Sequence, residues 1–154
     1  MIPPPDSLDI HWMQRALAQA RAAREREEVP IGAVIVCNNE LYAEAYNLTR
    51  TNADPTAHAE LLAIREGARR HGDWRLNEAT VYVTLEPCAM CAGAMVLDRI
   101  KRLVFATFDP KAGMCGSLHN LVQDVRLNHR LDVSSGVLAE ESGELLRTFF
   151  RERR

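Results

Sequence analysis

The stretch ATVYVTLEPCAMCAGAMVLDRIKRLVFATF, residues 79–108, decides the fold. Residues 79–86 and 102–108 are rich in β-branched and aromatic side chains, which is typical of strands. Between them, residues 88–99 predict a short helix that begins directly after Pro87. A strand, a helix and a second strand in this order give two parallel strands joined by a right-handed crossover. The stretch therefore predicts an α/β fold built around a βαβ unit.

The segments on either side extend this pattern. Apolar residues recur every three or four positions near the N-terminus, which indicates a helix, and the Val29-Pro30 pair ends it. The near-continuous apolar run after Pro30 is typical of a strand covered on both faces, and an Asn-Asn-Glu turn leads into an alternating segment, as in a hairpin. Outside the βαβ unit we expect helices at 7–28, 57–72 and 139–154, strands at 31–37, 41–47 and 131–138, and a helical turn at 118–124.

This order of elements predicts a three-layer α/β/α sandwich, with helices on both faces of one mixed sheet of about five strands. The chain has 154 residues, and we expect a single domain, residues 1–154, that is large enough to bury a hydrophobic core.

Charge and hydropathy exclude several classes of protein. The formal net charge of −2 provides no bulk attraction to nucleic acid, so an RNA partner would need a local basic patch. No apolar run approaches the ~18 residues of a membrane span. The N-terminal sequence MIPPPDSLDI lacks a basic region followed by an apolar stretch, so it does not predict a secretory signal. These features predict a cytoplasmic protein without a membrane partner.

The Pro-Cys-Ala-Met-Cys motif has three interpretations: a redox dithiol, half of a structural zinc site, or part of a catalytic zinc site. A closed structural site needs four ligands, usually with a second close pair, but Cys37 and Cys115 are isolated. A catalytic zinc needs three protein ligands and one open position. His58, Cys88 and Cys91 form such a set, and both cysteines fall where a helix start favours the thiolate.

Glu60 follows the candidate ligand His58 by two positions, so the two side chains point to different sides of a regular helix. They can share a site if His58 lies in the first helical turn and binds the metal through its nearer ring nitrogen. Asp54 as a cap, with Pro55 as the first helical residue, predicts that placement. Glu60 would then be a proton carrier beside the water that zinc activates.

The HAE and PCAMC motifs together match the His-x-Glu…Pro-Cys-x-x-Cys signature of the zinc nucleobase deaminases. The segments EVPIGAVIV, HAELLAIREGA, VYVTLEPCAMCAGAM, RIKRLVFATFDPKAGMCGS, LNHR and LLRTFFRERR extend the likeness over nearly the whole chain. In these segments the chain resembles the bacterial tRNA-specific adenosine deaminases of the cytidine/deoxycytidylate deaminase superfamily. The resemblance implies a cytidine deaminase-like fold, one zinc ion per subunit and a homodimer. It also implies conversion of the wobble adenosine of an arginine tRNA anticodon to inosine.

Carried over to this sequence, the resemblance implies His58, Cys88 and Cys91 as zinc ligands and Glu60 as the acid/base. It implies that Asn47 contacts the target base. The positions that would hold the flanking anticodon nucleotides are Asp109, Lys111, Asn128, Phe150 and Arg154. The last eight residues contain four arginines and one glutamate, so this end is locally basic, as RNA binding requires.

Other interpretations remain open at this point. Asn47 could be a turn former at a strand end. The adjacent Phe149 and Phe150 could both be core residues, although one of them must point away from the other. The main alternative function is a deaminase of a free base or nucleoside, such as guanine, cytosine or cytidine. A catalytically silent zinc module with a scaffolding role is a second alternative, which the carboxylate of Glu60 disfavours.

Overall fold

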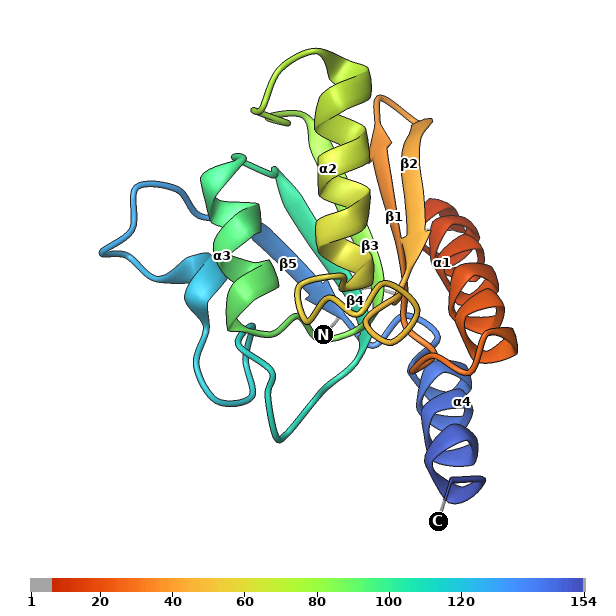
Figure 1. Cartoon of the computed structure of the whole chain (residues 1–154). Helices are drawn as coiled ribbons and strands as arrows, with labels where there is room; N and C mark the ends of the chain where they lie inside the picture. The colour runs from red at the N-terminus through yellow and green to blue at the C-terminus, as the bar shows by residue number, and fades with distance from the viewer. Residues whose placement is uncertain (1–6, 154) are drawn as a thin grey trace.

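A five-stranded mixed sheet forms the centre of the computed structural model, which describes residues 7–153 (Figure 1). The strand order is β2-β1-β3-β4-β5; the β2-β1-β3 part is antiparallel and the β3-β4-β5 part is parallel. The predicted hairpin, the parallel βαβ unit and the strand number are all confirmed. The strands are β1 (Gly32–Cys37), β2 (Glu40–Tyr46), β3 (Ala79–Leu85), β4 (Arg102–Thr107) and β5 (Asp132–Ser135).

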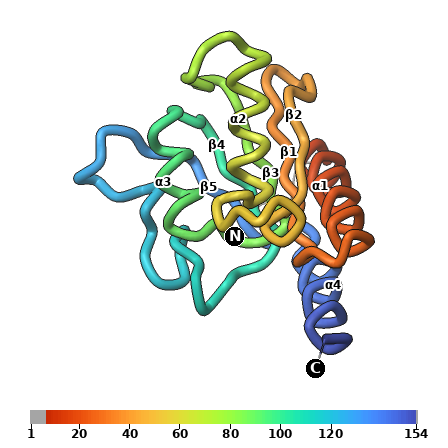
Figure 2. Tube along the Cα trace, in the orientation of Figure 1, coloured from red at the N-terminus to blue at the C-terminus, as the bar shows by residue number. Residues whose placement is uncertain are grey.

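Helices cover both faces of this sheet, as the three-layer prediction requires (Figures 1 and 2). Helices α2 and α3 and the 3-10 turn η1 lie on one face, and α1 and α4 lie on the other. The elements are α1 (Ser7–Glu25), α2 (Ala59–His71), α3 (Ala89–Leu97), η1 (Leu121–Gln123) and α4 (Ala139–Arg151). None of the helices within residues 7–153 combines the length and apolar character needed to cross a membrane.

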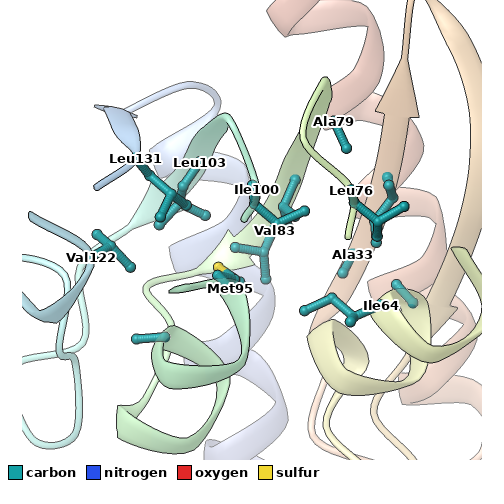
Figure 3. Close-up of a cluster of buried hydrophobic side chains, with 14 of the residues drawn as sticks. Ala33, Ile64, Leu76, Ala79, Val83, Met95, Ile100, Leu103, Val122 and Leu131 are labelled. Carbon is teal, nitrogen blue, oxygen red and sulfur yellow. The ribbon is translucent and has the colours of Figure 1, made fainter. Parts of the chain in front are cut away.

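Two hydrophobic clusters hold the layers together, and β1 contributes to both. Ala33 and Ile35 belong to the cluster under α2 and α3, whereas Val34 and Val36 belong to the cluster under α1. This alternation follows from the two-residue period of a strand, and it explains why the whole strand had to be apolar. Figure 3 shows the first cluster, in which Met95 of α3 faces the sheet.

Three predicted ends were wrong because the backbone turns earlier than the hydrophobic pattern indicates. Helix α1 ends at Glu25 instead of residue 28, and Glu27 has a φ of 60° in the turn that follows. Strand β5 ends at Ser135, because Gly136 has a φ of 91° and donates its N–H to the carbonyl groups of residues 105 and 106. Helix α4 ends at Arg151 instead of continuing to residue 154.

The start of α2 also differs from the prediction. Asp54 does not cap this helix: its Oδ1 accepts hydrogen bonds from the N–H and hydroxyl of Thr56, at 2.8 and 2.7 Å, and closes a local turn. His58 has an extended conformation and is the N-cap residue of a helix that begins at Ala59. The prediction that His58 lies in the first helical turn was therefore wrong by one position.

The fold brings two helix N-termini to the same end of the sheet. Helix α3 begins after the carboxyl end of β3, and α2 begins beside it, so both open toward the lower end of the molecule in Figure 1. This juxtaposition, between elements far apart in the chain, creates the candidate site.

Candidate metal centre and substrate pocket

His58, Cys88 and Cys91 converge at the shared end of α2 and α3. His58 and Cys88 are the N-cap residues of the two helices, with similar extended conformations (φ −76°, ψ 150° and φ −76°, ψ 177°). Cys91 lies in the first turn of α3 and is fully buried. The ligand atoms of the three side chains all lie within 4.8 Å of one another. The predicted convergence of the two motifs on one site is confirmed.

The spacing of these atoms fits zinc. The Nδ1 atom of His58 is 3.7 Å from the Sγ of Cys88 and 3.6 Å from the Sγ of Cys91. Tetrahedral coordination with Zn–S of about 2.3 Å and Zn–N of about 2.0 Å places nitrogen and sulfur about 3.5 Å apart, close to the distances observed here. The nearer ring nitrogen of His58 therefore faces the thiols, as predicted. Hydrogen bonds from Cys91 and His58 lower the pKa of Cys88 to about 3, which favours the thiolate that binds metal.

Glu60 lies next to this centre in the first turn of α2 and is only 4 % exposed. It does not belong to the group of candidate ligands among residues 7–153. Burial raises the pKa of its carboxyl group to about 7. A carboxyl group with such a pKa can both accept and donate protons at neutral pH, which suits a general acid/base.

A small pocket opens in front of the metal centre. Its volume is about 170 Å³, and it is lined by Val29, Ile31, Asn47, Thr49, His58, Ala59 and Glu60. Pockets for drug-sized ligands have volumes of about 300–1,000 Å³, so this one has room for a single flat ring system. Asn47 is 4 % exposed, and its amide can both donate and accept hydrogen bonds. The structure therefore places a polar side chain, two apolar walls and Glu60 around one small space.

A second pocket of about 460 Å³ shares two of these walls, Val29 and Ile31. Three of the predicted substrate-binding residues, Asp109, Lys111 and Phe150, line it. The ring of Phe150 is 51 % exposed, whereas the neighbouring Phe149 is 2 % exposed and belongs to the interior.

Two predicted substrate-binding residues do not join this pocket. Asn128 is exposed on the segment between η1 and β5 and lines neither pocket. Arg154 lies outside the described residues.

Sequence reasoning missed two buried glutamates that shape the loops around both pockets. Glu28 is fully buried and accepts hydrogen bonds from the N–H groups of Arg50 and Thr51, at 3.1 and 2.6 Å, in the loop that follows Asn47. Glu86 is 2 % exposed and accepts four hydrogen bonds from the loop that follows β4. Burial acts to raise the pKa of Glu86, but these bonds hold it below its usual value. For Glu86, the available signal in the sequence was a charged residue at the junction of a buried strand and the metal motif.

Comparison with known proteins places the chain in a family. Residues 8–154 match the family model of the MafB19-like deaminases. The tRNA-specific adenosine deaminase of Bacillus subtilis (strain 168) is 54 % identical over 146 residues, which cover 95 % of this chain and 91 % of that protein. This chain belongs to the tRNA-specific adenosine deaminases. Another member, from Haemophilus influenzae, is 48 % identical over 95 % of this chain and 85 % of its own length.

The fold agrees with membership in the tRNA-specific adenosine deaminases. A solved structure from a study of A-to-I editing by tRNA:A34 deaminases at the wobble position superposes with a TM-score of 0.85 and 46 % identity. The match covers 88 % of this chain and 99 % of that one. The deaminase family is zinc-dependent, and His58, Cys88 and Cys91 form a group among residues 7–153 that could hold a metal.

Proposed function

We propose that this protein hydrolytically deaminates adenosine to inosine at the wobble position of a tRNA anticodon and releases ammonia. The observation that carries the proposal is the arrangement of Glu60 beside three convergent zinc ligands, at the base of a pocket sized for one ring system. Membership in the tRNA-specific adenosine deaminases supports adenosine in tRNA over a free base or nucleoside.

The proposed chemistry uses one zinc ion per subunit, held by His58, Cys88 and Cys91. Bound zinc supplies a Lewis acid that makes water nucleophilic at neutral pH. Glu60 accepts a proton from the attacking water and delivers it to the adenine ring nitrogen next to the carbon under attack. Glu60 then carries the remaining proton of the attached oxygen to the amino group, the carbon–nitrogen bond breaks to release ammonia, and the oxygen stays as the carbonyl of inosine.

Recognition of the base is assigned to the 170 Å³ pocket. A base that enters it must leave its stack, because the pocket is too small for two stacked rings. The buried amide of Asn47 would read the polar edge of that base, and Val29 and Ile31 would provide apolar contacts.

Recognition of the anticodon loop is assigned to the 460 Å³ pocket. Single-stranded RNA is held by stacking on aromatic rings and by cations on the phosphate backbone. The exposed ring of Phe150 and the ammonium of Lys111 supply these two contacts, and Asp109 supplies a hydrogen-bond acceptor. Arg154 would add a further cation at the end of the chain.

A homodimer is the proposed assembly. Large apolar side chains are exposed on α3 and on the segments around η1, which packs against α3: Leu97 (69 %), Leu118 (60 %) and Val125 (76 %). A second copy would cover them. Asn128 lies on the same segment as Val125, and we propose that in a homodimer it contacts RNA bound in the partner's pocket. Arginine tRNA as the substrate and a cytoplasmic location complete the proposal.

The test is inosine formation by the zinc-loaded protein on an anticodon stem-loop with a wobble adenosine. Free adenosine, guanine and cytidine are assayed in parallel, and the same stem-loop with a wobble guanosine is the matched control. We expect conversion of the wobble adenosine alone, loss of turnover after chelation, and recovery when zinc is restored. Conversion of a free base or nucleoside instead would refute the RNA substrate but keep the deaminase chemistry.

A further inference from the structure

The loop that follows β4, residues 108–118, is built around the carboxylate of Glu86. Oε1 accepts hydrogen bonds from the N–H of Asp109, at 2.9 Å, and from the hydroxyl of Ser117, at 2.5 Å. Oε2 accepts hydrogen bonds from the N–H groups of Cys115 and Ser117, at 3.0 and 2.9 Å. All four donors come from the two ends of one loop, so a single side chain fixes its path.

The loop backbone also passes directly over this carboxyl group. A Cβ atom at Gly113 would overlap the side chain of Glu86, so only glycine fits at this position. The N–H of Met114 donates to the carbonyl of Pro87, at 2.9 Å, which attaches the middle of the loop to the residue before the zinc ligand Cys88. The loop and the metal-binding segment therefore share one rigid junction.

The same hydrogen bonds continue to the mouth of the larger pocket. Glu86 holds the backbone of Asp109, and the Oδ1 of Asp109 accepts hydrogen bonds from the N–H groups of Lys111 and Ala112, at 3.1 and 3.2 Å. Asp109, Lys111 and the intervening Pro110 line the 460 Å³ pocket. An unbroken chain of contacts thus joins the metal-binding segment to the surface assigned to the anticodon loop.

We propose that Glu86 is a positioning residue for substrate recognition: it sets the location of Asp109 and Lys111 relative to the metal centre. Glu86 belongs neither to the candidate metal ligands nor to the lining of the two pockets, so it acts through the loop. The geometry is independent of the substrate, and the effect on RNA binding rests on the function proposed above.

The first test measures the loop itself in the zinc-loaded protein. In Glu86→Gln, an NH₂ group replaces one carboxylate oxygen and faces N–H or O–H donors, so at least one backbone hydrogen bond is lost. We expect faster hydrogen–deuterium exchange in residues 109–117 and unchanged exchange in β3. The matched control is Glu78→Gln, because Glu78 precedes the other end of β3 and pairs at the surface with Lys101, at 3.5 Å. Unchanged exchange in the loop would overturn the proposal.

The second test separates positioning from chemistry in single-turnover deamination of the stem-loop. We expect Glu86→Gln to raise the half-saturating RNA concentration about tenfold, because the lost contacts act on RNA binding. The deamination rate at saturating RNA and the zinc content should both stay within about threefold of the parent values. Ser117→Ala removes only the hydroxyl donor to Glu86 and should raise the half-saturating RNA concentration by a smaller factor. This variant takes the place of Glu86→Gln in the test if Glu86→Gln does not fold.

The outcomes distinguish the two proposals. Glu86→Gln could instead lose zinc, or lose the deamination rate at saturating RNA, with no change in the half-saturating RNA concentration. That result would show that Glu86 only supports the metal centre, and it would overturn the proposed role in recognition. If the parent protein fails to convert the stem-loop, the proposed function fails, and the exchange experiment alone decides whether Glu86 holds the loop.

Discussion

Replacing Asp98 with asparagine should stabilise the protein at alkaline pH. Asp98 ends α3 and is 6 % exposed, and its Oδ2 atom has no hydrogen-bond partner within residues 7–153. Its Oδ1 accepts one long hydrogen bond, 3.3 Å from the N–H of Ile100. The carbonyl groups at a helix C-terminus also disfavour an anion. Burial therefore raises the pKa of Asp98 to about 7, against an ordinary value of 3.8.

The magnitude follows from this difference in pKa. Because the folded protein binds this proton more tightly than the unfolded chain, the stabilising contribution is complete below about pH 4 and is lost as the pH rises through about 7. Between about pH 5.5 and about pH 8, the free energy of unfolding should fall by about 2 kcal/mol from this group alone. Asp98→Asn has no such proton, so this part of the pH dependence disappears.

Urea denaturation of both proteins at the two pH values provides the assay, with zinc held constant. Other titrating groups cancel in the difference between variant and parent. We expect that difference to favour the asparagine variant by about 2 kcal/mol more at about pH 8 than at about pH 5.5. The same difference at both pH values would refute the reasoning, because any effect of packing alone is independent of pH.

Three further predictions concern the core and the site. Asp9→Ala removes the carboxylate that accepts hydrogen bonds from Tyr82 and Arg102, both at 2.8 Å. Because this breaks a largely buried ion pair, we expect urea titrations to show a free energy of unfolding about 2–4 kcal/mol lower than in the parent. A change within about 0.5 kcal/mol, as expected of an exposed pair, would contradict this. Phe150→Ala removes a half-exposed ring, so it should weaken stem-loop binding about tenfold with little change in the melting temperature of the protein. If the variant binds the stem-loop as tightly as the parent, the RNA does not stack on this ring. Glu60→Gln should lower the turnover number by at least about 10²-fold, while the zinc content measured by atomic emission stays unchanged. Loss of zinc in this variant would instead indicate that Glu60 is a metal ligand.

Elements with strong periodicity and motifs with a fixed chemical requirement were predictable from the sequence. The βαβ unit around Cys88 followed from two β-branched runs on either side of a short helix. The convergence of His58 with the two cysteines followed because both segments begin helices that must pack on one sheet. In both cases the information is local, or depends on one rule of topology.

Features that depend on hydrogen bonds between distant segments were not predictable. Asp54 resembles a helix cap, but its carboxylate is used by Thr56, and this competition between local bonds decides where α2 begins. Glu28 reads as part of an exposed charged helix end, yet the turn at Glu27 directs it into the interior. Glu86 gains its role from donors more than 20 positions away, which no periodicity can reveal.

The division of the site along the chain has a consequence for laboratory evolution. The three candidate ligands and the proposed proton carrier Glu60 all lie within residues 58–91, the reactive segment, whereas most pocket-lining residues come from segments on either side, residues 29–49 and 108–150. Apart from the candidate ligand His58 and the proposed proton carrier Glu60, the residues that line these two pockets and fall inside the reactive segment are Ala59 and Leu85. Libraries restricted to the flanking segments could therefore explore new nucleic-acid substrates while the reactive segment stays constant.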